Sequence, residues 1–142
     1  MHVVITGASQ GIGFAIAEIF ANAGYTLCLC SKTKENIAAA SNSLAVKYPH
    51  ATIHFTHADL SKKEQCTQFA NWCLEKGTPT ILINNAGFQH VAVIEDFPTA
   101  VYQKLINVML VGSFIGIKYA FRSACVLKMN MKSCFKSVSQ AE

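Results

Sequence analysis

Three glycines near the start of the chain have a spacing that suits a phosphate-binding turn, Gly7-x3-Gly11-x-Gly13. The apolar run at residues 3–5 and the apolar stretch at residues 14–20 predict a buried strand, a tight turn and the start of a helix. The free backbone N–H groups and the dipole of a helix N-terminus attract phosphate, and glycine allows close approach to the backbone. The pattern therefore predicts a nucleotide site. Its candidate residues are Gly7, Ser9, Gln10, Gly11, Ile12 and Gly13.

The glycine spacing alone would also fit an ordinary tight turn, and it differs from the G-x-G-x-x-G pattern of many nucleotide sites. We favour a nucleotide site because the turn stands between an apolar strand and an apolar helix.

Polar side chains follow two later apolar runs, at the points where strands are predicted to end. Asp59 follows the third predicted strand, and Asn84 and Asn85 follow the fourth. Open α/β sheets bind ligands at this edge, where a carboxylate can accept a hydrogen bond from an adenine amino group. The alternatives are a turn or helix-capping role for Asp59 and sheet-end hydrogen bonds for the two amides.

The residues after the second predicted strand bear on the choice between two dinucleotides. Sites specific for NAD place an acid there to bind the ribose 2′-hydroxyl, but this chain has no acid before Glu35. Ser31 and Lys32 could instead hold a 2′-phosphate through a hydroxyl and a point charge. We therefore predict NADP(H) in preference to NAD(H); the alternative is that Lys32 is a solvated loop residue.

Strands and helices are predicted to alternate along the chain, which implies an α/β fold with a parallel sheet and right-handed crossovers. A capping box at residues 61–64 is expected to open the third helix, and Pro98 or Thr99 the fourth. The predicted strands are 2–6, 26–30, 51–56 and 80–84, and the first three helices are 11–23, 34–48 and one from the capping box to Gly77.

The composition fits one domain with a substantial core. Of the 142 residues, 51% are hydrophobic and 14% are charged, which excludes a disordered chain. No signal peptide is expected, and no apolar run is expected to approach the roughly 18 residues of a membrane span. We expect a cytoplasmic protein with reduced cysteines, no metal site and no nucleic-acid partner.

Taken together, these motifs resemble the short-chain dehydrogenase/reductase family over roughly residues 1–121. The glycine turn is similar to the family's cofactor turn, Asp59-Leu60 to the pair that meets the adenine, and Asn84-Asn85-Ala86-Gly87 to its N-N-A-G motif. The resemblance implies a Rossmann-like three-layer fold with strand order 3-2-1-4, truncated after about four strands. It adds Leu60, Asn85, Ala86 and Gly87 to the candidate cofactor residues. Residues 87–98 are locally similar to hydroxybutyrate dehydrogenases.

The catalytic groups that the resemblance implies are absent from this sequence. The family's Tyr-x3-Lys would need a lysine four residues after a tyrosine, and none of the four tyrosines has one. Met109 stands where the family has its catalytic Asn, and Asn107 is two residues earlier, about 200° away around an α-helix. We therefore predict that the chain descends from NAD(P)-dependent oxidoreductases that act on a small carbonyl or alcohol. We also predict that these 142 residues alone do not catalyse the reaction. The alternatives are a non-catalytic nucleotide-binding or interaction domain and a frameshifted gene product.

The C-terminal part of the chain is different in character. Residues 118–142 hold five basic side chains and one acidic one, and the rest of the chain balances at zero. We divide the chain into a dinucleotide-binding domain, 1–122, and a basic, amphipathic, helical tail, 123–142. Such a tail could bind a membrane or a partner groove. Alternatively it extends the fourth helix onto its own domain, or was acquired by truncation or frameshift.

Truncation after the fourth strand would leave that strand at the edge of the sheet. An apolar, uncharged edge can pair with another chain. We therefore predict self-association through this edge or through the fourth helix.

Overall fold

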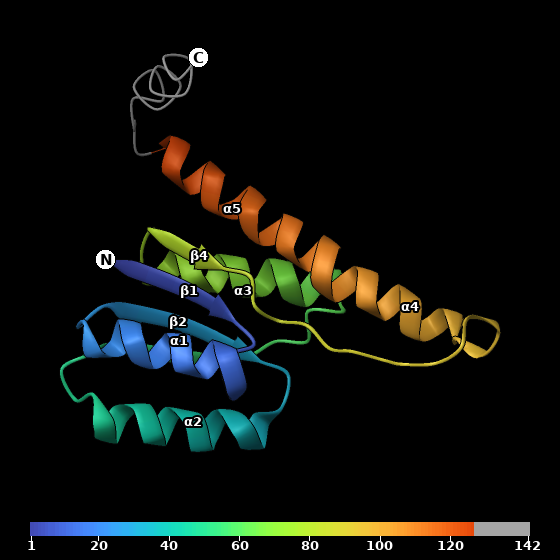
Figure 1. Cartoon of the computed structure of the whole chain (residues 1–142). Helices are drawn as coiled ribbons and strands as arrows, with labels where there is room; N and C mark the ends of the chain where they lie inside the picture. Colours follow the sequence, from blue (N-terminus) through green and yellow to red (C-terminus); the bar gives the residue numbers. More distant parts are fainter. Residues whose placement is uncertain (127–142) are drawn as a thin grey trace, which may run out of the picture.

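The computed structural model describes residues 1–126, which form a four-stranded parallel sheet covered by helices on both faces (Figure 1). The strands are β1 (His2–Thr6), β2 (Thr26–Ser31), β3 (Ile53–His57) and β4 (Ile81–Ile83), in the order β3-β2-β1-β4. This order confirms the predicted Rossmann-like fold. The helices are α1 (Gly11–Asn22), α2 (Lys34–Lys47), α3 (Lys63–Lys76), α4 (Thr99–Ile106) and α5 (Ser113–Val126), with a 3-10 turn η1 (Ile94–Asp96) and a π-helical stretch η2 (Asn107–Gly112).

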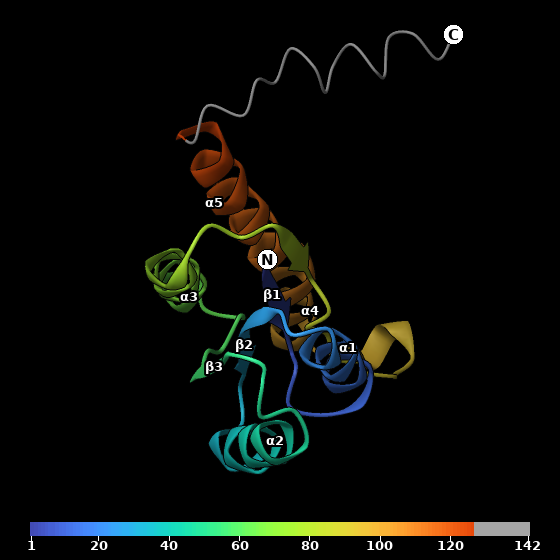
Figure 2. The same ribbon diagram turned by 90° about the vertical axis from the view of Figure 1, so that its left-hand side faces the viewer.

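Alternate residues of the strands face opposite layers of helices, so the apolar runs are buried on both sides of the sheet. Helices α1 and α2 cover one face, and α3 and α5 cover the other (Figure 2). The first core contains Val3, Ile5, Ala17, Leu27, Leu29 and Leu44. The second contains Val4, Cys28, Cys30, Phe69 and Cys73. Cys28, Cys30, Cys66 and Cys73 are free and buried, and they pack as small hydrophobic side chains.

The predicted capping box at residues 61–64 is wrong. Helix α3 begins at Lys63, and its N-cap residue, Lys62, makes no side-chain capping hydrogen bond. The hydroxyl of Ser61 donates instead to Oδ1 of Asp59, at 2.7 Å, because a carboxylate attracts this donor more strongly than the helix end attracts the hydroxyl oxygen. The strand ends also differ from the prediction: β3 begins at Ile53 rather than at residue 51, and β4 has three residues rather than five.

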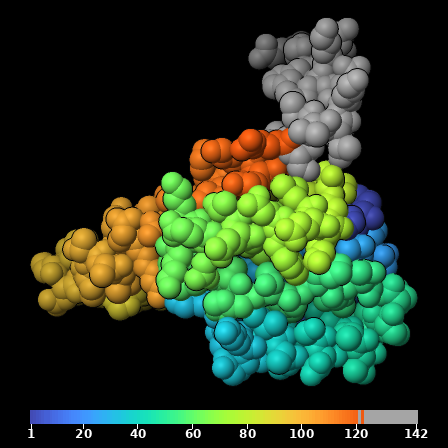
Figure 3. Space-filling view, turned by 180° about the vertical axis from the view of Figure 1, so that it is seen from behind, coloured from blue at the N-terminus to red at the C-terminus, as the bar shows by residue number. Residues whose placement is uncertain are grey.

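The last helical part is longer than the sheet that it covers. After the N-cap Pro98, α4, η2 and α5 follow one another without a break from Thr99 to Val126. The end at α4 projects beyond the body of the molecule, as the gold atoms in Figure 3 show. The proposed boundary at residue 122 falls within α5. The predicted tail helix beyond Val126 lies outside the described residues.

One helix bears on the expectation that no apolar run approaches membrane-span length. An 18-residue window within Thr99–Ala120 has a mean hydropathy of 1.5, and 11% of that window is buried. By length and composition this one helix of the described part of the chain could cross a membrane. Those are the only criteria it meets, and a helix of a soluble protein can meet them too. Polar residues such as Lys104 and Asn107 interrupt the apolar run, but they do not lower its average below that of a span.

Candidate functional site

A cleft of about 540 Å³ opens at the carboxyl ends of β1, β2 and β4. This is the edge at which open α/β sheets bind ligands, and the volume suits a small-molecule site. The cleft brings together the predicted site residues with the exception of Gly13. Those that line it are Gly7, Ser9, Gln10, Gly11, Ile12, Ser31, Lys32, Asp59, Leu60, Asn85, Ala86 and Gly87.

Two of the glycines are required by the geometry of the turn. Gly7 has φ +67°, a left-handed conformation, and a Cβ there would lie 2.9 Å from the Cα of Ala86. A Cβ on Gly13 would collide with the carbonyl oxygen of Gly7 and with Nδ2 of Asn85. Gly13 therefore does not line the cleft; it lets the first turn of α1 pack closely under the glycine turn.

The hydroxyl of Thr6 joins the end of β1 to the loop after β4. It accepts hydrogen bonds from the backbone N–H groups of Asn85 and Ala86, both at 3.0 Å, and donates to the carbonyl oxygen of Ile83 at 3.4 Å. The side chain of Asn85 donates in turn to the carbonyl oxygens of Thr6 and Gly7, both at 3.1 Å. The sheet-end role considered for Asn85 is thus present, and the same bonds fix one wall of the cleft.

The end of β2 meets the glycine turn through side chains. The hydroxyls of Ser9 and Ser31 share a hydrogen bond of 2.7 Å, and the amide of Asn36 donates to Oε1 of Gln10 at 3.3 Å. Within residues 1–126, Asp59 is the only acid that lines the cleft. The end of β2 therefore presents hydroxyls and Lys32 rather than a carboxylate.

Asp59 takes part both in a turn and in the cleft. Its Oδ1 accepts from the backbone N–H of Ser61 at 3.0 Å and from the Ser61 hydroxyl, and its Oδ2 lies 3.2 Å from Nζ of Lys32. Its own backbone N–H donates to Oε1 of Gln65 at 2.7 Å. Burial acts to raise the pKa of Asp59, but the bonds from Ser61 and Lys32 outweigh it and hold that pKa below its usual value.

Sequence reasoning missed several residues of the cleft. Lys104 of α4 and Phe88 of the loop after β4 line it, and Nζ of Lys104 lies 5.4 Å from the centre of the Phe88 ring. No local pattern around Lys104 marks it, because its place depends on the length and direction of the helix that carries it. The other lining residues that were not predicted are Cys30, Thr33, Asn36, Ala58 and Val108.

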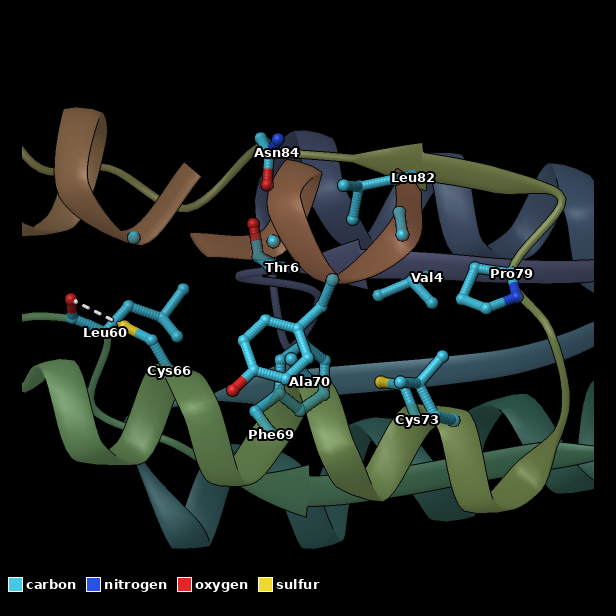
Figure 4. Close-up of a pocket in the computed structure, with 15 residues that line it drawn as sticks. Val4, Thr6, Leu60, Cys66, Phe69, Ala70, Cys73, Pro79, Leu82 and Asn84 are labelled. Atoms are coloured by element: carbon cyan, nitrogen blue, oxygen red, sulfur yellow. Dashed lines mark hydrogen bonds between the residues drawn. The ribbon is translucent and has the colours of Figure 1, made fainter. Parts of the chain in front are cut away.

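A second, much smaller cavity lies between β1, β4, α3 and α5 (Figure 4). Its volume of about 30 Å³ has room for little more than one water molecule. Val4, Phe69 and Leu82 face it, and at one side the thiol of Cys66 donates to the carbonyl oxygen of Leu60 at 3.3 Å. This cavity is a packing gap and is too small for a substrate.

The sequence matches a known family over most of its length. A model of the family described as short chain dehydrogenase matches residues 1–134. The chain belongs to the short-chain dehydrogenase family. Its members are oxidoreductases that bind NAD(P).

Members of the family with curated sequences match the chain over about half of their own length. An uncharacterized oxidoreductase, YxjF of Bacillus subtilis, is 39% identical over 120 residues, which cover 83% of this chain and 46% of the relative. A D-beta-hydroxybutyrate dehydrogenase of Rhizobium meliloti is 34% identical over 119 residues, 82% of this chain and 46% of the relative.

Solved structures of short-chain dehydrogenases have the same arrangement. An alcohol dehydrogenase from the archaeon Thermococcus sibiricus, complexed with 5-hydroxy-NADP, superposes with a TM-score of 0.79 at 30% identity, over 86% of this chain and 52% of that one. L-sorbose reductase from Gluconobacter frateurii, complexed with NADPH and L-sorbose, gives a TM-score of 0.80 at 25% identity, over 86% and 46%.

Met109, which the family resemblance places at the position of the catalytic Asn, lies in the π-helical stretch η2. It is half exposed, and its Cγ and Cε pack beside Gly87 at the rim of the cleft. Asn107 does not line the cleft. Its amide donates to the carbonyl oxygen of Ser61 at 3.3 Å, and its Oδ1 accepts from Gln103 at 2.9 Å. The α-helical offset of about 200° does not describe this pair, because η2 is wound more loosely than an α-helix.

Proposed function

We propose that this chain binds an NAD(P) dinucleotide in the cleft at the carboxyl ends of β1, β2 and β4, with NADP(H) preferred over NAD(H). The main support is that the glycine turn, the end of β2, Asp59 and the loop after β4 all line one cleft. The Cβ position of Gly11 has no heavy atom within 4 Å, and this open space fits the close approach of a pyrophosphate to a helix N-terminus.

Each part of the cleft has a role in this proposal. The N-terminus of α1 and the turn residues Ser9 to Ile12 hold the pyrophosphate, and Asp59 with Leu60 meets the adenine. Ser31 and Lys32 receive the 2′-phosphate, since no carboxylate stands at the end of β2 to repel it. Asn85, Ala86 and Gly87 line the wall along which the rest of the cofactor extends. When bound, the nicotinamide ring supplies or accepts a hydride.

We infer that the lineage activity is hydride transfer between the cofactor and a small carbonyl or alcohol. The D-beta-hydroxybutyrate dehydrogenase, alcohol dehydrogenase and L-sorbose reductase among the similar proteins support this substrate class. We further propose that these 142 residues do not catalyse this hydride transfer by themselves. They contain no Tyr-x3-Lys, and Met109 has no amide to offer at the Asn position.

The second candidate function is a nucleotide-binding or interaction domain without catalysis, which the Met109 side chain favours. We propose that such a domain spans residues 1–122, with 123–142 as a separate tail, and that it acts in the cytoplasm, where buried thiols stay reduced.

A frameshifted gene product is the third candidate. Binding of NADPH without turnover would support the second, and failure to fold or bind the third.

Self-association is part of this proposal. Within residues 1–126 no strand pairs with the outer edge of β4. The helix beside it exposes Leu110, Phe114 and Ile117, which are three and four residues apart and so share one face. An apolar strand edge and an apolar helix face next to each other favour contact with a second copy.

Fluorescence titration with NADPH and with NADH, followed by an assay with a ketone panel, tests the proposal. Saturable binding with tighter NADPH affinity and no turnover is expected. Absence of saturable binding to the folded chain would overturn it.

A further inference from the structure

We propose that Lys104 of α4 is a specificity-determining residue that forms, with Lys32, a two-lysine site for the 2′-phosphate of NADP(H). This inference rests on the proposed function and adds a residue from a distant element. Lys32 follows β2, whereas Lys104 comes from the helix after the loop that follows β4, and both line the same cleft.

The charged side chains that line the cleft do not balance. Among the residues that the structure describes, Asp59 is the only acid lining the cleft, whereas Lys32 and Lys104 both line it. The carboxylate already accepts two hydrogen bonds from Ser61 and lies 3.2 Å from Lys32. One positive charge is therefore left uncompensated at this wall of the cleft.

Lys32 and Lys104 line the same cleft, and Nζ of Lys32 lies 3.2 Å from Oδ2 of Asp59. The charge of Lys32 is close enough to Lys104 to hold the pKa of Lys104 below its ordinary value. Two ammonium groups held together repel each other, and a dianion placed between them would relieve that repulsion and keep both protonated.

Lys104 is held at the cleft by a contact with an aromatic ring. Its side chain is partly buried and its Nζ lies over the ring of Phe88, another residue lining the cleft. This cation–π contact keeps the ammonium group near the rim instead of in bulk solvent. The same cleft holds the hydroxyl of Ser31, which shares a hydrogen bond with Ser9, and the amide of Asn36, which has a second N–H besides the one that it donates to Gln10. A phosphate monoester in this cleft would therefore meet polar groups as well as the two ammonium groups.

The site has a simple consequence for selectivity. A cofactor with a free 2′-hydroxyl leaves one of the two lysine charges uncompensated, because Asp59 pairs with Lys32, whereas a 2′-phosphate supplies the missing negative charge. Lys104 should therefore contribute to the affinity for the phosphorylated cofactor and not to affinity for adenosine in general.

Binding of two small probes to the full chain separates these contributions. The probes are 2′,5′-ADP, which carries the 2′-phosphate, and 5′-AMP, which does not. Isothermal titration calorimetry compares the wild type with Lys104→Gln, Lys32→Gln, the double variant and Lys104→Arg. Lys34→Gln is the matched control, because Lys34 is exposed two residues after Lys32 and does not line the cleft.

We expect Lys104→Gln to weaken the binding of 2′,5′-ADP by about five- to tenfold, because one charge-assisted contact is lost. The affinity for 5′-AMP should change by less than about twofold. Lys104→Arg should retain the preference, and the double variant should bind both probes about equally. Equal affinities of wild type and Lys104→Gln for 2′,5′-ADP would overturn the role of Lys104 while leaving the proposed function standing. Equal weakening of both probes would also overturn it. A folded wild type that binds neither probe would contradict the proposed function itself, and this inference with it.

Discussion

Nδ2 of Asn85 lies 3.1 Å from the carbonyl oxygen of Gly7, so the loop after β4 holds the glycine turn after β1 in its shape. The two segments are far apart in the sequence and meet because β4 pairs with β1 in the sheet. The same amide also donates to the carbonyl oxygen of Thr6. A single side chain thus connects two of the motifs that we assign to the cofactor.

Asn85→Ala should lower both stability and cofactor affinity. It removes two part-buried hydrogen bonds, and we expect a loss of about 1–2 kcal/mol in the free energy of unfolding. Urea denaturation and NADPH titration measure the two effects. Asn42→Ala, at an exposed position of α2, is the control and should leave both unchanged. Equal behaviour of the two variants would show that Asn85 does not hold the turn.

Gly13→Ala should destabilise the fold more than Gly11→Ala does. The new methyl group at residue 13 meets the Gly7 carbonyl and the Asn85 amide, an overpacking that typically costs about 1–3 kcal/mol. At Gly11 there is no heavy atom within 4 Å, and only the strain of φ +58° applies, about 1 kcal/mol. Thermal unfolding followed by circular dichroism ranks the two, and the reverse order would contradict the packing described for Gly13.

Asp59→Asn should reduce stability at neutral pH and have no effect in acid. The pKa of Asp59 is lowered in the folded protein, so its contribution is present above the unfolded-state value of about 3.9 and is lost as the pH falls through the folded-state value. We expect a difference of about 0.5–1 kcal/mol at pH 7 and at pH 5, because the ion pair is partly exposed. Urea unfolding at pH 7, 5 and 3 measures it, with Asp96→Asn as an exposed control. A difference that grows towards low pH would contradict the role given to Asp59.

Phe114→Glu should weaken self-association. Phe114 is 65% exposed on α5. A charge buried in a contact between two copies would weaken that contact. Light scattering after size exclusion gives the mass in solution, and we expect the variant to shift towards the monomer. Val46→Glu, at an exposed apolar position of α2, should not change the mass. An unchanged mass for Phe114→Glu would direct attention to the edge of β4 instead.

The sequence was most informative where residues that act together are close along the chain. Apolar runs predicted the strands and the parallel sheet, whereas the family resemblance implied their order. Short motifs such as Gly7 to Gly13 predicted most of the residues lining the cleft. These features depend on local backbone geometry and on the edge at which parallel strands end.

The sequence was least informative where a side chain had several partners within reach. Ser61 fits a capping box by spacing, but its hydroxyl donates a hydrogen bond to the carboxylate of Asp59 instead. Lys104 has no motif, because its position depends on where a long helix begins and how it crosses the sheet. The π-helical winding around Met109 is equally a consequence of packing rather than of a residue pattern.

The affinities of the wild-type chain for NADPH and NADH, measured beside those of Ser31→Asp, test the central claim most directly. Ser31 ends β2, where a carboxylate would bind a free 2′-hydroxyl and repel a 2′-phosphate. We predict that the wild type binds NADPH about tenfold more tightly than NADH, and that Ser31→Asp reverses the order. A folded wild type that binds neither cofactor, or that binds NADH more tightly, would contradict the proposed function.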